Sequence, residues 1–303
     1  MRRSLPALIA IAVVAGAALT GCTGNSIAAS AACDVKSGSG SESIRATGAF
    51  GKDPEARVPS PLNVSTAQST TLIRGDGKVV GSGGLAVAYL TVFDGPTGEP
   101  GGSTAENFIP VNAKTVGAGL AGAIGCARVG SRLAIVLPGK QASAIFGSPA
   151  GDSVSVIADI TRAFPNRATG RARPATPGFP TVVLAPNGQP GIVIGSHAAP
   201  TKAQSAVLRQ GEGAVTTKKD ALIIQTQIVT WSDQTSATGT WENGAPTAQG
   251  LTDGSVLAKE LLGQRVGSQV IVLTPASKSQ DGNASATVVD ILGTVPAASL
   301  QQQ

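Results

Sequence analysis

Histidine and aromatic side chains are scarce in this chain. A single histidine, His197, occurs among 303 residues, so catalytic constellations that depend on a histidine base are poorly supported. His197 lies between small residues and is expected on a surface loop. No group of cysteines and histidines has metal-ligand spacing, so we expect neither a metal nor a cofactor. Aromatic residues make up 3% of the composition, which leaves a core of small aliphatic side chains.

Charged residues are also few, at 14% of the chain, and the formal net charge is +5. The basic residues are scattered apart from those in 162–173, so nucleic acid is not expected as a partner. That cluster alternates with proline and glycine and is expected to be a solvated linker; contact with anionic surface polymers is the alternative. By contrast, 39 glycines and 19 prolines accompany abundant valine, isoleucine and threonine. This mixture is typical of short β-strands joined by many turns.

The first residues indicate export. Arg2 and Arg3 precede an apolar run over 5–20, which is too short for a membrane span and is typical of a signal peptide. The run ends in Leu-Thr-Gly-Cys at 19–22, which resembles the lipobox of bacterial lipoproteins. In that family the cysteine is diacylated and cleavage occurs just before it. The resemblance implies a lipid anchor on Cys22 and a place on the outer, extracytoplasmic face of the cell membrane. The alternative is an ordinary signal peptide with a chance cysteine.

Two further cysteines remain once Cys22 is assigned to lipid. Cys33 and Cys126 form an even pair in an oxidising compartment, which suggests a disulfide. Two free thiols are the alternative, because the sequence does not show that the pair is close in space.

An internal repeat organises the chain. Residues 128–138 recur as 265–275, with Arg-Val-Gly-Ser and a closing proline in both copies. Three more matches follow the same order at spacings of 131 or 136 residues: 74–77 with 210–213, 54–58 with 190–194, and 157–160 with 288–291. The chain is therefore a tandem duplication, and each copy is long enough to hold its own core. The Gly-Asp-Gly at 75–77 is expected to be a hairpin turn rather than a phosphate or metal loop.

Each unit is expected to combine strands with one helix. Apolar, β-rich runs over 85–93, 222–231, 132–137 and 269–273 predict strands, the last two ending at proline. In 252–263, Asp253 or Ser255 can cap a short amphipathic helix with Leu257 and Leu261 on one face, and Gly263 can end it. Its counterpart over 116–125 is rich in glycine and predicts a weaker helix or an irregular turn.

The second unit resembles an FKBP-type peptidyl-prolyl cis-trans isomerase domain. The resemblance rests on Leu-Leu-Gly-Gln-Arg-Val-Gly-Ser at 261–268 leading into a strand that stops at Pro275, on 207–213, and on 241–246. It covers most of the second unit and the first more loosely. It implies an α+β fold of two tandem FKBP-like domains, each an antiparallel sheet wrapped on one short helix. The expected divisions are a signal peptide (1–21), a lipidated tether (22–43), domain 1 (44–163), a linker (164–180), domain 2 (181–296) and a tail (297–303).

The resemblance also implies where a substrate would lie. The family holds a proline ring in a cup of aromatic side chains with an Asp and a Tyr at its rim. Here Thr238 stands at the Asp position, Thr226 at the Tyr position and Leu257 at the floor tryptophan, while Tyr89 takes the tyrosine position in the first unit. The implied substrate-binding residues are Val256, Leu257 and Trp241 as walls, and Thr226 and Tyr89 as rim groups.

Three functions fit these features. The first is a lipid-anchored isomerase with a weakened active site that assists folding of proline-containing exported polypeptides. Isomerisation needs no nucleophile or metal, but each lost aromatic removes burial of roughly 1.5–3 kcal/mol. The second is a non-catalytic chaperone or peptide-binding lipoprotein in which Trp231 and Trp241 belong to the core or to a peptide-binding face. The third is a structural or solute-binding lipoprotein of the cell envelope.

Overall fold

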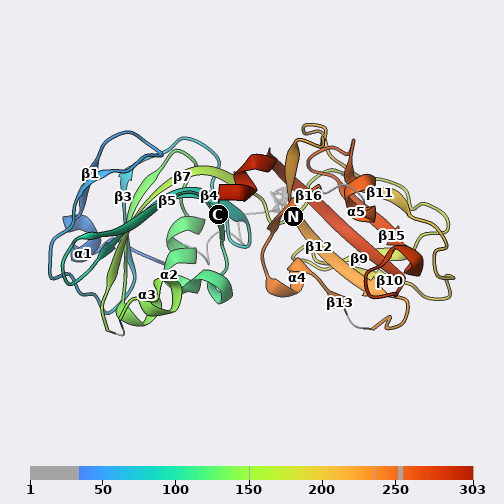
Figure 1. The fold of residues 1–303 in the computed structure, drawn as a ribbon, viewed down its shortest axis with the longest axis horizontal. Coiled ribbons are helices and arrows are strands. Elements are labelled where there is room, and N and C mark those ends of the chain that lie inside the picture. Colours follow the sequence, from blue (N-terminus) through green and yellow to red (C-terminus); the bar gives the residue numbers. More distant parts are fainter. Residues whose placement is uncertain (1–33, 150, 236, 252–254, 303) are drawn as a thin grey trace, which may run out of the picture.

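The computed structural model describes residues 34–149, 151–235, 237–251 and 255–302 (Figure 1). The chain folds into two units that lie side by side, the first blue to green and the second yellow to red (Figure 1). All strand pairs in the two main sheets are antiparallel, with helices against them. The predicted α+β class with two antiparallel units is confirmed.

The first unit is built on a five-stranded sheet of order β3-β6-β7-β4-β5. Its elements are α1 (Ser39–Ser43), β1 (Arg45–Thr47), β2 (Glu55–Arg57), β3 (Gln68–Ile73), β4 (Leu85–Asp94), β5 (Pro100–Pro110), α2 (Ala113–Gly125), β6 (Arg132–Leu137), α3 (Gly139–Phe146) and β7 (Val154–Phe164).

The second unit repeats this order in a seven-stranded sheet. Its path is β13-β12-β16-β15-β11-β8, and β14 also pairs with β12. Its elements are β8 (Arg171–Ala172), β9 (Thr181–Leu184), β10 (Pro190–Val193), β11 (Gln204–Gln210), β12 (Asp220–Thr230), β13 (Ala237–Thr238), α4 (Thr240–Asn243), β14 (Thr247–Gly250), α5 (Val256–Leu261), β15 (Gln269–Thr274), η2 (Ala276–Lys278), β16 (Ser285–Pro296) and η3 (Ala297–Gln302). The segment expected to be a linker contributes β8, which pairs with β11.

Each sheet is covered on both faces. In the first unit α2 packs on one face through Leu120 and Ile124, and the β1–β2 hairpin covers the other. In the second unit α5 packs on one face and the β9–β10 hairpin on the other. Because side chains alternate along a strand, neighbouring residues of β4 or β12 face different layers. One residue of such a pair therefore faces the helix and the next faces the hairpin.

The two helices differ from the prediction in relative length. The Ser255 hydroxyl caps α5 by accepting from the Ala258 N–H, as expected, but α5 has only 6 residues. Its counterpart α2 has 13, with a break at Val116 and Gly117, so the 116–125 segment is a kinked helix and not an irregular turn. Tertiary packing outweighs propensity here. A Cβ on Gly119 would stand 2.6 Å from the Ala67 Cβ, so glycine lets α2 approach its neighbours closely.

The repeated glycine motifs interlock. The Gly75 N–H donates to the Ser131 hydroxyl at 3.0 Å, and the Gly211 N–H donates to Ser268 at 2.9 Å. A Cβ on Gly75 would stand 2.2 Å from the Val129 carbonyl oxygen, a distance that side chains do not allow. The expected hairpin turn at 75–77 is thus a loop lying against the 128–131 turn.

The units meet through an apolar interface. Equivalent positions from both copies supply it: Leu85 and Val87 of β4 together with Ala221 and Ile223 of β12. Phe164 packs so closely on β16 that a Cβ on Gly293 would stand 2.2 Å from its ring. Leu292 and Val295 complete the buried cluster. Outside it, η3 lies against both β5 and β14.

No helix among the described residues is long and apolar enough to cross a membrane. Cys126 is disulfide-bonded. Cys33 and the anchor position Cys22 lie outside the described residues, so the pairing and the lipid anchor stay predictions.

The close contact between Phe164 and Gly293 predicts that a larger residue at position 293 will destabilise the fold. Gly293→Ala should lower the free energy of unfolding by about 1–3 kcal/mol, because the new methyl group overlaps the Phe164 ring. Calorimetry or urea titration measures the change. Gly101→Ala is the matched control, since its Cβ would find no atom nearer than 3.8 Å. Adding Phe164→Leu should recover part of the loss; an unchanged stability of Gly293→Ala would contradict the close packing.

Candidate functional site

The implied pocket of the second unit lies on the helix side of its sheet. Val256 and Leu257 are half-buried and pack against the cluster that includes Leu222 and Ile224. Thr226 follows these two on β12 with the same alternation, so its side chain belongs to this face as well. The structure therefore brings these aliphatic walls and the threonine to one face.

Trp241 is held beside Thr226 by α4. The Thr226 N–H donates to the Thr240 hydroxyl at 2.8 Å, and the Thr240 N–H donates back to the Thr226 hydroxyl at 3.3 Å. Trp241, next in the chain, is half-buried, and its indole nitrogen is buried without a hydrogen-bond partner among the described residues. The Thr226 hydroxyl is thus already engaged within the protein. The hydroxyl keeps its own proton as a donor, but Thr226 is only 8% exposed.

Tyr89 lies on the other face of its own sheet. Tyr89 pairs with Asp159 across the strands. In the second unit the equivalent aspartate, Asp290, pairs with Gln225, so Tyr89 corresponds to Gln225 and not to Thr226. The Tyr89 hydroxyl donates to Asp53 at 2.6 Å on the hairpin side. This hydrogen bond raises the pKa of Tyr89 above its usual value. Tyr89 and Thr226 therefore do not occupy equivalent positions, and the structure does not group them.

The remaining named residues are structural in their contacts. Trp231 packs against the apolar cluster under the β9–β10 hairpin, and its indole N–H donates to the His197 carbonyl at 2.9 Å. Thr238 is exposed on β13 opposite Ile228. Among the described residues no three His, Cys, Asp or Glu side chains gather at metal-binding distance.

A buried ion pair marks the first unit. The guanidinium of Arg132 donates to both oxygens of Asp159 at 2.7 Å, and the two side chains are 0% and 2% exposed. Arg132 also donates to three backbone carbonyls in the β1–β2 turn, those of Thr47, Gly48 and Ala49. The pair therefore ties the hairpin to the sheet.

The second unit retains the aspartate of this pair, as Asp290, but has no arginine opposite it. Gln269 stands at the position of Arg132 and donates to Asp290 at 2.7 Å, while the Ala168 N–H donates at 3.1 Å. Burial raises the pKa of Asp290 to about 6, against these hydrogen bonds, which lower it. A cavity of about 370 Å³ beside it is lined by Arg167 and Arg209, among others. Sequence reasoning missed this difference because it depends on which strands pair.

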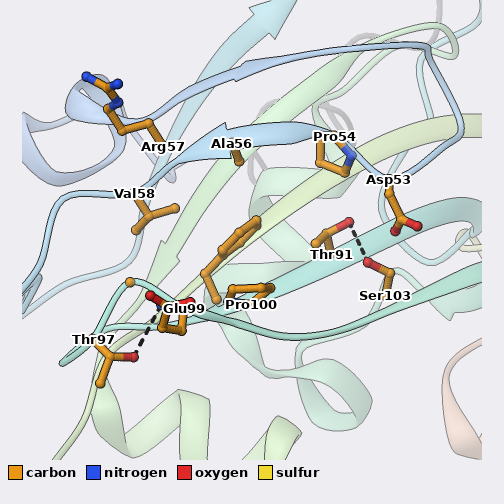
Figure 2. Close-up of a pocket in the computed structure, with 12 residues that line it drawn as sticks. Asp53, Pro54, Ala56, Arg57, Val58, Thr91, Thr97, Glu99, Pro100 and Ser103 are labelled. Atoms are coloured by element: carbon orange, nitrogen blue, oxygen red, sulfur yellow. Dashed lines mark hydrogen bonds between the residues drawn. The ribbon is translucent and has the colours of Figure 1, made fainter.

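A second hollow lies in the first unit on the face that carries Tyr89. It has a volume of about 710 Å³ between the β1–β2 hairpin and the β4–β5 part of the sheet (Figure 2). We call it the hairpin groove. Its lining residues are Asp53, Pro54, Ala56, Arg57, Val58, Thr91, Phe93, Thr97, Gly98, Glu99, Pro100 and Ser103. Sequence reasoning matched 54–58 with 190–194 but did not see that this segment borders a groove.

Comparisons with solved structures find FKBP-domain proteins at low identity. The three FKBP domains of wheat FKBP73 are 12% identical, with a TM-score of 0.33, over 76% of this chain and 94% of that one. FkpA from Escherichia coli is 15% identical, with a TM-score of 0.28, over 38% and 52%. A putative peptidyl prolyl cis-trans isomerase FKBP12 from Mycobacterium tuberculosis is 20% identical, with a TM-score of 0.26, over 32% and 86%. No protein-family model and no curated protein matches the chain. These similarities do not assign the chain to a family.

The buried carboxyl group of Asp290 should make the stability of the chain depend on pH. Because the pKa of Asp290 is raised to about 6 from 3.8, the folded chain binds its proton more tightly than the unfolded chain. The Asp290 contribution to the free energy of unfolding is therefore highest below pH 3.8 and is lost, by on the order of 3 kcal/mol in all, as pH rises through about 6. Asp290→Asn should remove this fall, because an amide does not titrate in this range. The Gln269 amide can turn to accept from the new amide.

The control is the equivalent change in the first unit. Asp159→Asn leaves the Arg132 guanidinium buried without its counter-ion and should cost about 3–5 kcal/mol at neutral pH. Urea titrations of the unmodified chain and both variants between pH 4 and 7 give the comparison. A pH profile of Asp290→Asn that parallels that of the unmodified chain would show that Asp290 does not titrate in this range.

Proposed function

We propose that this chain is a membrane-anchored, extracytoplasmic, FKBP-type peptidyl-prolyl isomerase with a weakened active site, acting on proline-containing exported polypeptides. The lipobox at Cys22 supports the location. The observation that carries the activity is the grouping of Thr226, Val256 and Leu257 on the helix face of the second unit. Thr226 comes from β12 and the other two from α5, so one face combines apolar walls with a polar rim.

The chemistry asks little of the residues. The barrier of about 18–20 kcal/mol arises from loss of amide resonance, so an apolar, water-poor wall that binds the twisted amide better than the planar one accelerates rotation. Leu257 supplies such a wall but covers less of a proline ring than an indole would. Thr226 is 8% exposed, so its hydroxyl, which accepts from the Thr240 N–H, has little access to a substrate. Both features support a slow enzyme.

A second function, peptide binding without catalysis, has its own support. The first unit places Tyr89 away from the helix face and bonds its hydroxyl to Asp53. Leu120, the residue equivalent to Leu257, is 2% exposed and belongs to the core. The first unit thus offers no cup over α2 built from the residues that the resemblance names. A chaperone that keeps both units and performs little chemistry would look like this.

Leu257→Trp separates the two functions. Residues 23–303 contain every residue that the structure describes and are the form to assay. The unmodified form should accelerate prolyl isomerisation weakly in an NMR exchange or protease-coupled assay, over an uncatalysed time of roughly tens to hundreds of seconds. Leu257→Trp should raise kcat/KM by about tenfold or more, since a large ring restores burial worth roughly 1.5–3 kcal/mol.

Leu184→Trp is the matched control, because it adds the same ring at an exposed position on β9. It should leave the rate unchanged, and circular dichroism should show that both variants are folded. If neither the unmodified chain nor folded Leu257→Trp accelerates the reaction, the isomerase proposal fails and peptide binding without catalysis remains.

A further inference from the structure

The hairpin groove has an apolar floor with charges at its ends. Phe93, which is 5% exposed, forms the floor together with Pro100, and Ala56 and Val58 of the hairpin side border it. In Figure 2 the Arg57 side chain extends to the side opposite Pro100. The groove therefore has an apolar floor within a largely polar lining, which includes two carboxylates, Asp53 and Glu99.

Asp53 is hydrogen-bonded inside the groove but, as a carboxylate, keeps acceptor capacity for a ligand. Thr91 and Ser103 bond to one another at 3.1 Å across the strands (Figure 2). Asp53 accepts from the Tyr89 hydroxyl, and the Ser103 and Tyr89 hydroxyls hold the pKa of Asp53 below its usual value, so it is ionised at neutral pH. Glu99 lies on the opposite side of the groove, on the β4–β5 turn (Figure 2). An occupant with a basic side chain is matched to this charge.

One wall of the groove is a strand with an open edge. Within the described residues β2 pairs only with β1, through Arg45–Arg57 to Thr47–Glu55, and belongs to a sheet of two strands. Its second edge presents backbone N–H and C=O groups without a strand partner. Such an edge is a template for an added strand, which gains main-chain hydrogen bonds.

The second unit shows what a closed version of this groove looks like. Ile192 stands where the first unit has Ala56, and it is 7% exposed within the cluster that contains Val229. Gln227 stands where the first unit has Thr91. Its side chain lies in a hydrogen-bonded group with Gln189 and Glu242, at 3.2–3.4 Å. Larger side chains thus occupy the space that Ala56 and Thr91 leave open.

We propose that the hairpin groove binds an extended polypeptide segment carrying a basic side chain, which adds a strand to the open edge of β2. The apolar side chains of the segment lie over Phe93 and Pro100, and its basic group lies near Asp53. This inference rests on the proposed function in so far as exported polypeptides are the ligands. It places them at a second surface, on the sheet face opposite to α2.

Peptide binding by residues 23–303 tests the proposal. The probes are two short fluorescent peptides of alternating valine and threonine, one with a central arginine and one with glutamine in its place. Ala56→Ile combined with Thr91→Gln copies the second unit and should weaken binding of the arginine peptide at least tenfold. Asp53→Asn should weaken the arginine peptide about two- to fivefold and the glutamine peptide hardly at all, as expected for one exposed charge pair.

The matched control is Val183→Ile, an exposed enlargement on the equivalent hairpin of the second unit, which should bind both peptides normally. Equal affinity of the unmodified chain and of the folded Ala56→Ile/Thr91→Gln variant would overturn the proposal. So would absence of binding by the unmodified chain.

The two proposals fail separately. The groove variant should keep the prolyl isomerisation rate of the unmodified chain, whereas Leu257→Trp should keep its affinity for the arginine peptide. A groove variant that loses isomerase activity while still binding the peptide normally would contradict the groove proposal and leave the isomerase proposal standing.

Discussion

A backbone contact that only glycine permits organises both units. Gly75 and Gly211 lie against the carbonyl oxygens of Val129 and Val266, where a Cβ would stand 2.2 and 2.3 Å away. Each contact joins the loop after one strand to the turn before a central strand. That turn carries the buried serine whose hydroxyl accepts from the glycine N–H. The residue after this serine is the first of β6 or β15. The contact therefore fixes the position of the buried side chain that begins the strand, Arg132 or Gln269. The strongest repeat in the sequence is therefore a packing requirement.

The two units share this backbone arrangement but carry different side chains at equivalent positions. At the first position of the strand one unit has Arg132 and the other Gln269. The acid opposite is Asp159, ion-paired with Arg132, or Asp290, hydrogen-bonded to Gln269. In the first unit the guanidinium ties the hairpin to the sheet, and the groove under the hairpin stays open. In the second unit larger side chains fill that space, and Thr226, Val256 and Leu257 lie on the helix face. The two copies thus keep the frame and differ in which face of the sheet is available to a ligand.

Much of the frame could be predicted from residues near one another in the sequence. The long apolar runs became β4 and β12, and the Ser255 cap correctly marked the start of α5. What failed depended on distant partners. Glycines that argue against a helix in isolation allow α2 to pack closely, and a shift of one residue between Tyr89 and Thr226 reverses the face of the side chain. The hairpin groove was missed because it depends on small side chains from β2 and β4, which meet only after folding. The sequence offered one signal of the groove, which is that Ala56 is small where its equivalent in the second unit, Ile192, is large.

Hydrogen–deuterium exchange tests most directly whether this chain holds extended polypeptide. Residues 23–303 would be compared with and without a saturating peptide that contains proline and arginine. Binding as described predicts slower exchange of the backbone amides in β2, at the open edge, and in the segment of β12 and α5 around Thr226 and Leu257. Unchanged exchange in both regions, at a concentration where the peptide is shown to bind, would contradict the account.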